Sequence, residues 1–140
     1  MAITFTNIYH DNIISTLATV LSDEFPIPTY LDEHRGNHSF LVTPESDSLI
    51  TKMSSGVQRE FNIAIEYRVK KGGQYNKNDF KQITNVMERL KRLIHNNSSY
   101  NNGSTWFDAI IDSIEYIRDE DDSSVLISTA TFNCQHIEAI

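Results

Sequence analysis

The chain has 140 residues, with 19 acidic and 12 basic side chains and a formal net charge of −7. This length suits a single domain with its own core, and the negative balance argues against a protein that grips phosphate backbones. No run approaches the roughly 20 apolar residues of a membrane-spanning helix, and the lone Cys134 excludes an internal disulfide and any multi-cysteine zinc site.

A helix is expected at the start of the chain. Asn7 can serve as its N-cap, and apolar residues recur at three- and four-residue steps, at Ile14, Leu17, Leu21 and Phe25. Pro26 and Pro28 end this helix, because proline disfavours helical backbone in the residue before it. The segment "PIPTYLDE" is therefore predicted to be extended.

Two strands are predicted next, separated by a loop. The segment "HSFLVTP" predicts a short strand that ends at Pro44, and a polar, serine-rich loop is expected from about 45 to 58. The segment "REFNIAIEYRVKK" then alternates apolar and polar residues, with Phe61, Ile63, Ile65, Tyr67 and Val69 on one face. This alternation predicts an antiparallel strand with one buried face and one wet face.

A second helix is predicted from about Asp79 to His95. Asn78 or Asp79 can cap it, and its apolar stripe consists of Phe80, Ile83, Met87, Leu90 and Ile94. Two long strands follow, "TWFDAIIDSIEYI" and "SVLISTATFNCQHI". Trp106, Phe107 and Tyr116 in this region are expected to anchor the core or an interface.

These elements predict one α+β domain over residues 1–140. We expect a mostly antiparallel sheet packed by two amphipathic helices, in the order α-β-β-β-α-β-β, with a long C-terminal hairpin. The pattern contains neither a βαβ nucleotide-binding unit nor a glycine-rich phosphate loop.

Four consecutive carboxylates, Asp119, Glu120, Asp121 and Asp122, lie between the last two predicted strands. An EF-hand loop needs alternating ligands, a central glycine and a final glutamate, and "RDEDDSSVLIST" lacks that pattern. Neighbouring side chains of an extended chain point to opposite sides, so these four do not easily converge on one ion. The run is interpreted as the solvated tip of a hairpin, with weak surface binding of Mg²⁺ or Ca²⁺ as the alternative.

The histidines offer two further candidate sites. His34 and His38 lie in "EHRGNHS", which is faintly similar to the residue set of an HNH nuclease but crowds it into one short turn. Cys134 and His136 share one face of a strand about 7 Å apart, with no third group evident to orient the histidine. No catalytic, metal-binding or cofactor-binding residue is assigned, and an enzyme is not expected. A divergent metal-dependent enzyme is the rival hypothesis.

Several segments together carry a resemblance to a known family: "PIPTYLDE", "HSFLVTPESD", "EFNIAIEYRV", "FKQITNVMERLKRLI" and "ISTATFNCQHIEAI". In order, length and strand character, residues 5 to 138 resemble the tail terminator and tail-completion (head–tail joining) proteins of tailed bacteriophages. No single signature motif carries this likeness.

The resemblance implies a structural virion protein without cofactors. Such a protein forms a ring, commonly a hexamer, that caps the tail tube and joins it to the head-side neck. Its implied partners are copies of itself, the tail tube protein, a head-side neck or connector protein, and genomic DNA that passes through the channel without specific binding. Its implied location is the virion tail or neck, and the host cytoplasm before assembly. The acidic tip would face solvent or the lumen of the ring.

The last strands suggest where subunits would meet. Each has about 12 residues, or about 40 Å, with half-polar faces, and such a hairpin needs a partner over its edge. We expect interface residues Val125, Ile127, Thr129, Thr131 and Asn133; a simple twisted sheet covered by the two helices is the alternative. Two other functions are kept open, another neck or connector component and a small cytosolic ligand-binding or regulatory domain.

Overall fold

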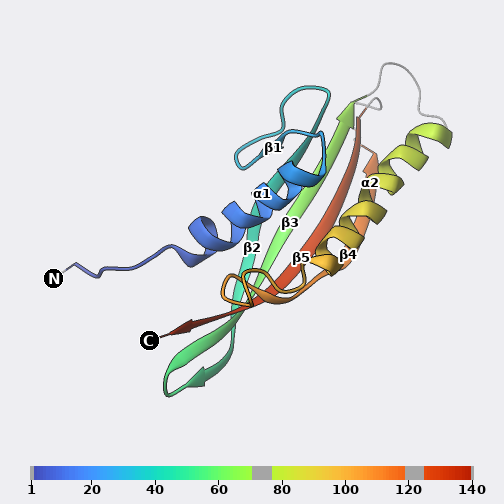
Figure 1. Cartoon of the computed structure of the whole chain (residues 1–140). Coiled ribbons are helices and arrows are strands. Elements are labelled where there is room, and N and C mark those ends of the chain that lie inside the picture. Colours follow the sequence, from blue (N-terminus) through green and yellow to red (C-terminus); the bar gives the residue numbers. More distant parts are fainter. Residues whose placement is uncertain (1, 71–76, 119–124, 140) are drawn as a thin grey trace.

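A computed structural model describes residues 2–70, 77–118 and 125–139 of the chain. It shows an α+β fold in the predicted order, with a five-stranded sheet of order β1-β2-β3-β5-β4 (Figure 1). The first helix begins with a π-helical segment, Ile8–Ile14, and continues as α1, Ser15–Glu24. The other elements are β1 (Thr29–Tyr30), β2 (His38–Met53), β3 (Gly56–Lys70), α2 (Lys77–Asn96), β4 (Phe107–Arg118) and β5 (Val125–Ala139).

The predicted cap of the first helix is confirmed. The Asn7 side chain accepts a hydrogen bond from the His10 N–H at 3.1 Å, which satisfies one of the free donors at the helix start. At the other end Phe25 is already extended, with φ −109° and ψ 137°, as expected for the residue before Pro26. Among the described residues, no helix is long and apolar enough to cross a membrane.

The predicted loop at 45–58 is wrong, because β2 continues through Pro44 to Met53 and turns directly into β3 at Gly56. Residues 43–53 are exposed, so their polar composition carries no apolar alternation to signal a strand. Backbone pairing with β3 holds them instead, with register shifts at Pro44/Ser46 and Leu49/Thr51. Proline is tolerated here because β1 covers only Phe40 and Leu41 of β2, and beyond them β2 is an edge strand.

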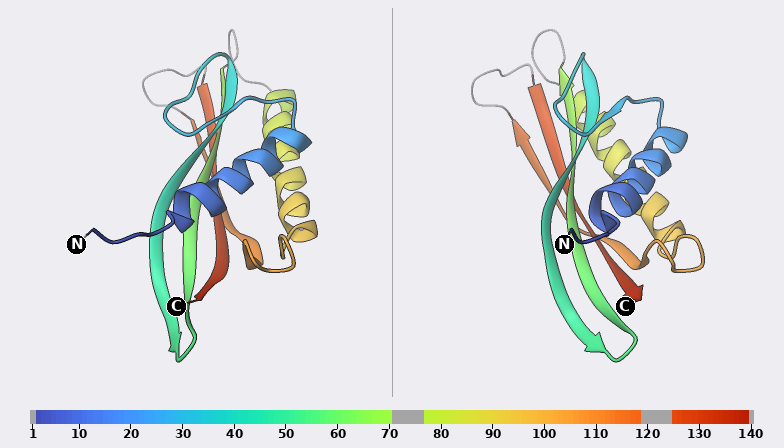
Figure 2. Two further views of the ribbon diagram at one scale, coloured as in Figure 1. Left: turned by 60° about the vertical axis from the view of Figure 1, so that its left-hand side comes forward. Right: turned by 90° about the vertical axis from the view of Figure 1, so that its left-hand side faces the viewer.

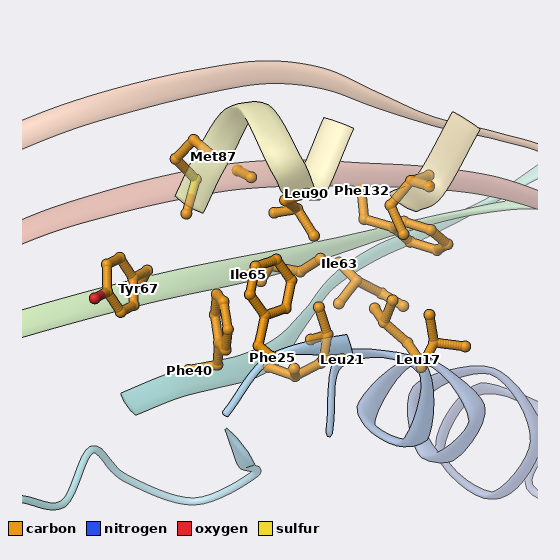
Figure 3. Packing of buried hydrophobic residues seen from close by; sticks show 14 of the residues in the cluster. Leu17, Leu21, Phe25, Phe40, Ile63, Ile65, Tyr67, Met87, Leu90 and Phe132 are labelled. Atoms are coloured by element: carbon orange, nitrogen blue, oxygen red, sulfur yellow. The ribbon is translucent and has the colours of Figure 1, made fainter. Parts of the chain in front are cut away.

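Both helices pack on one face of the sheet, and the β2–β3 hairpin extends beyond them (Figure 2). The predicted alternation of β3 is confirmed, since its apolar residues at 61, 63, 65, 67 and 69 are all buried. Phe40 of β2 and Phe132 of β5 complete this layer against Leu17 and Leu21 of α1 and Met87 and Leu90 of α2 (Figure 3). Burial of this apolar layer is the main source of stability.

The predicted C-terminal hairpin is also present, with β4 antiparallel to β5. β5 additionally pairs along its whole length with β3, from Gly56↔Ala139 to Lys70↔Val125. It is therefore a central strand, and β4 forms the outer edge of the sheet.

Candidate interaction surfaces

His34 and His38, the two histidines of the segment "EHRGNHS", are not brought together. His34 Nδ1 lies 2.6 Å from the Ser39 hydroxyl and its Nε2 lies 2.9 Å from a Glu66 carboxylate oxygen. This resembles a Ser–His–Glu arrangement, but Ser39 is only 1% exposed and cannot meet a substrate. His38 pairs with Val69 and faces the helices, on the other side of the sheet. The cluster therefore fastens a loop whose turn Gly36 permits with a φ of +75°.

Cys134 and His136 share one face of β5, as predicted, and both are buried. Burial raises the pKa of the Cys134 thiol to about 12, with a smaller contribution from the charge of Glu60. The thiol is thus protonated at neutral pH and is not a nucleophile. His136 Nδ1 lies 2.9 Å from the Thr105 carbonyl, so it holds the loop before β4.

In the described ranges no group of three or more histidine, cysteine or carboxylate side chains is placed to hold a metal ion. The acidic tip at Asp119–Asp122 lies outside the described residues.

The aromatic anchors divide between core and surface. Trp106 is fully buried and packs edge-on against Phe132. Phe107 is half-buried, whereas Tyr116 on the edge strand is about half exposed.

A cavity of about 270 Å³ lies between the segment after α1, the helix α2, and the sheet near His38 of β2 and Tyr67 of β3. Phe25 and Ile27 form part of its apolar wall, and the side chains of His38, Tyr67 and Asn85 add polar groups. Burial raises the pKa of the Tyr67 phenol, and the nearby Gln82 side chain partly offsets this. This combination of apolar wall and few polar groups is typical of small-ligand pockets.

The face of the sheet opposite the helices, here called the open face, is mostly polar. Its central residues are half-buried by their neighbours: Gln58, Glu60, Asn62, Ala64, Glu66 and Arg68 on β3, and Ile127, Thr129, Thr131, Asn133 and Gln135 on β5. The Asn133 amide donates to Glu60 at 2.6 Å and to Asn62 at 2.8 Å. These cross-strand bonds hold neighbouring side chains of the face in place.

The predicted interface residues all lie on the side of β5 that includes the open face, but with one correction. Val125 is fully buried within the chain and is not available to a partner. Ile127, Thr129, Thr131 and Asn133 are half-buried there. The edge argument also changes, because β5 is paired on both sides. Because β3 and β4 already pair with the backbone of β5, a partner would contact these residues through their side chains. Backbone groups free to pair with a partner lie on other strands.

Three strands of the described sheet have an unpaired edge: β4, the two-residue β1, and β2 beyond Leu41. The edges of β4 and β2 carry exposed apolar side chains. On β4 these include Ile110 and Ile117, and at the β2–β3 hairpin they are Leu49, Ile50 and Met53. The sequence reading missed the hairpin group, because it placed residues 45–58 in a loop.

Residues 2–6 precede the first helix and are here called the N-terminal arm. Ile3 is 84% exposed and Phe5 is 78% exposed. The alternation of these two residues with Thr4 and Thr6 was a signal in the sequence that could have singled out this segment.

No family model matches the sequence, and no curated protein matches it.

Proposed function

We propose that this chain is a structural virion protein, a tail terminator that forms a ring, caps the phage tail tube and joins it to the head-side neck. In this role the chain acts through contacts between subunits and between rings. Its channel lets the genome pass without specific binding.

The observation that carries the proposal is the amount of surface that a monomer leaves unpartnered. The open face, the β4 edge and the β2–β3 hairpin all present side chains or backbone that another protein can cover. These three surfaces differ from one another in composition, so a contact between copies can join two different surfaces. Contacts between two different surfaces are head-to-tail, and head-to-tail contacts produce a ring when the rotation closes.

Charge supports the same proposal. The net charge of −7 suits a channel past which DNA moves, since like charge keeps the nucleic acid from adhering. Three carboxylates, Glu60, Glu66 and Glu115, lie on the open-face side of the sheet.

The direct test is native mass spectrometry of the full chain over a concentration series, with negative-stain images of the same samples and co-sedimentation with tail tubes. We expect closed rings, either free or formed on the tube end. Strict monomers that also fail to bind tubes would refute the proposal.

The role of the open face can be tested with Thr129→Arg. Thr129 pairs with Glu66 and with Glu115, so an arginine meets two carboxylates and the folded chain accommodates it. At an interface the bulky cation should block assembly. Thr19→Arg, on the exposed side of α1, adds the same side chain as a control. If both variants assemble like the wild type, the open face is not an interface.

The second candidate function is ligand binding in the cavity beside Tyr67. A small-molecule screen by thermal shift tests it. Stabilisation that Asn85→Leu abolishes, in a chain that stays monomeric, would favour this function over the ring.

A further inference from the structure

We propose that the N-terminal arm of one copy pairs, as an added strand, with the unpaired edge of β2 in a neighbouring copy, along residues 43–53. This inference rests on the proposed ring and identifies one of its contacts. Addition of an extended segment to an open sheet edge is a common mode of protein association.

The arm has the properties of a strand that lacks a partner. Ile3 and Phe5 point to one side of an extended chain, and Thr4 and Thr6 point to the other. No backbone hydrogen bond joins residues 2–6 to another described residue. The arm spans about 16 Å at strand spacing, enough to cover about five residues of an edge.

The edge of β2 has the properties of an acceptor. Its backbone groups are unpaired on the outer side beyond Leu41, in the part of the chain that the structure describes. The hairpin extends past both helices, so an added strand meets no obstruction from them (Figure 2). Leu49 and Ile50 are exposed beside this edge and can receive the apolar side chains of an arm.

Within its own chain the arm begins beside the hairpin but makes no backbone hydrogen bond with the β2 edge. The Tyr9 hydroxyl donates to the carbonyls of Ser46 and Asn62, which fixes the start of the first helix against its own hairpin. From there the chain runs outward through Asn7, with φ −76° and ψ 86°, away from the body of the molecule (Figure 1). Phe5 borders a hollow on its own hairpin, yet most of its side chain remains exposed. The arm is thus free to meet a second copy.

Charge favours the arm over the β4 edge as the occupant. Residues 43–53 carry Glu45 and Asp47 against one cation, Lys52, and β4 carries three carboxylates, Asp108, Asp112 and Glu115, against Arg118, so both segments have a net negative charge. Pairing β4 of one copy with β2 of the next would bring like charges together, which is destabilising. The arm carries no charged side chain, so it avoids this repulsion.

Two double variants test the role of the arm in assembly. Because the arm is exposed in the single chain, Ile3→Ser/Phe5→Ser should leave the monomer's thermal midpoint unchanged. It should raise the concentration needed for assembly about tenfold or more, since two large apolar side chains lose their burial. Thr4→Ser/Thr6→Ser changes the same arm without removing apolar groups and should assemble like the wild type. Equal behaviour of the two double variants, or a wild-type chain that never associates, would overturn the inference.

Cross-linking identifies the acceptor edge. Phe5→Cys chains are mixed with isotopically labelled Ser48→Cys chains and treated with a short bismaleimide; the buried Cys134 does not react. A mixed-isotope cross-link is expected. The matched partner Ser113→Cys, on the β4 edge, should give none. A cross-link to position 113 instead of 48, or a doubly substituted chain that cross-links within itself on dilution, would overturn the inference.

These results separate the two proposals. Rings that form equally well with either double variant would remove the arm contact and leave the tail-terminator proposal standing. A mixed cross-link at position 48 in a protein that does not bind tail tubes would support the arm contact and count against the tail-terminator proposal.

Discussion

Trp106 joins three parts of the fold, and its replacement by phenylalanine should be costly. Its indole N–H donates to the Asn97 carbonyl at 2.8 Å, just beyond the end of α2, and its ring packs against Tyr100 and Phe132. Phenylalanine keeps the ring contacts in part but removes the donor. Leaving the Asn97 carbonyl without a partner lowers the free energy of unfolding by about 1–3 kcal/mol. The smaller ring lowers it by about 1 kcal/mol more, because apolar burial is lost and a cavity is left.

Trp106→Phe should therefore lower the free energy of unfolding by about 2–4 kcal/mol, or roughly 6–12 °C in Tm for a domain of this size. Urea and thermal unfolding followed by far-UV circular dichroism measure this, since the variant lacks the chain's one tryptophan. Leu31→Ala, at an exposed apolar residue, is the control and should change stability by less than about 0.5 kcal/mol. A Trp106→Phe effect no larger than that of the control would refute the anchoring role of this hydrogen bond.

The other predictions concern three single residues, Cys134, His34 and Gly56. Cys134 should resist thiol reagents at pH 8 until the chain unfolds, and fast stoichiometric labelling of the native protein would contradict its burial. Because its folded pKa of about 12 exceeds the ordinary value of 9.0, its contribution to stability is complete below pH 9 and is lost as the pH rises towards 12; Cys134→Ala should flatten this decline in urea titrations. His34→Ala should lower the free energy of unfolding by about 1–3 kcal/mol, since Ser39 and Glu66 lose their hydrogen bonds to it. His10→Ala, at the exposed helix start, is the control and should change this free energy little. Equal effects of the two variants would refute the loop-fastening role of His34. Gly56→Ala should lower Tm by several degrees, because a Cβ there would lie 2.8 Å from the Glu138 carbonyl oxygen. Ser55→Ala is the control. If the two variants have the same Tm, the backbone around Gly56 shifts at little cost and the close approach does not require glycine.

Periodic local patterns predicted much of the fold. The three- and four-residue spacing in the two helices and the two-residue alternation in β3 follow from burial on one side only, so each can be recognised without its neighbours. Asn7 and Pro26 marked the ends of the first helix for equally local reasons.

The polar half of β2 could not be found in this way. Residues 43–53 are exposed, and the ladder to β3 that makes them a strand depends on residues up to 21 positions away, as in the pair Thr43 and Ala64. The same limit applies to His34, whose contact with Glu66 spans 32 positions and distinguishes a fastened loop from a reactive turn.

The candidate surfaces depend most strongly on the three-dimensional arrangement. The alternation in β5 correctly grouped Ile127, Thr129, Thr131 and Asn133 on one side, because side chains of a strand alternate wherever it lies in a sheet. It did not reveal that β5 is a central strand, or that β2 and β4 carry open edges. Strand order is set by which apolar faces can share one core with the two helices, and that is a property of the whole chain rather than of any segment.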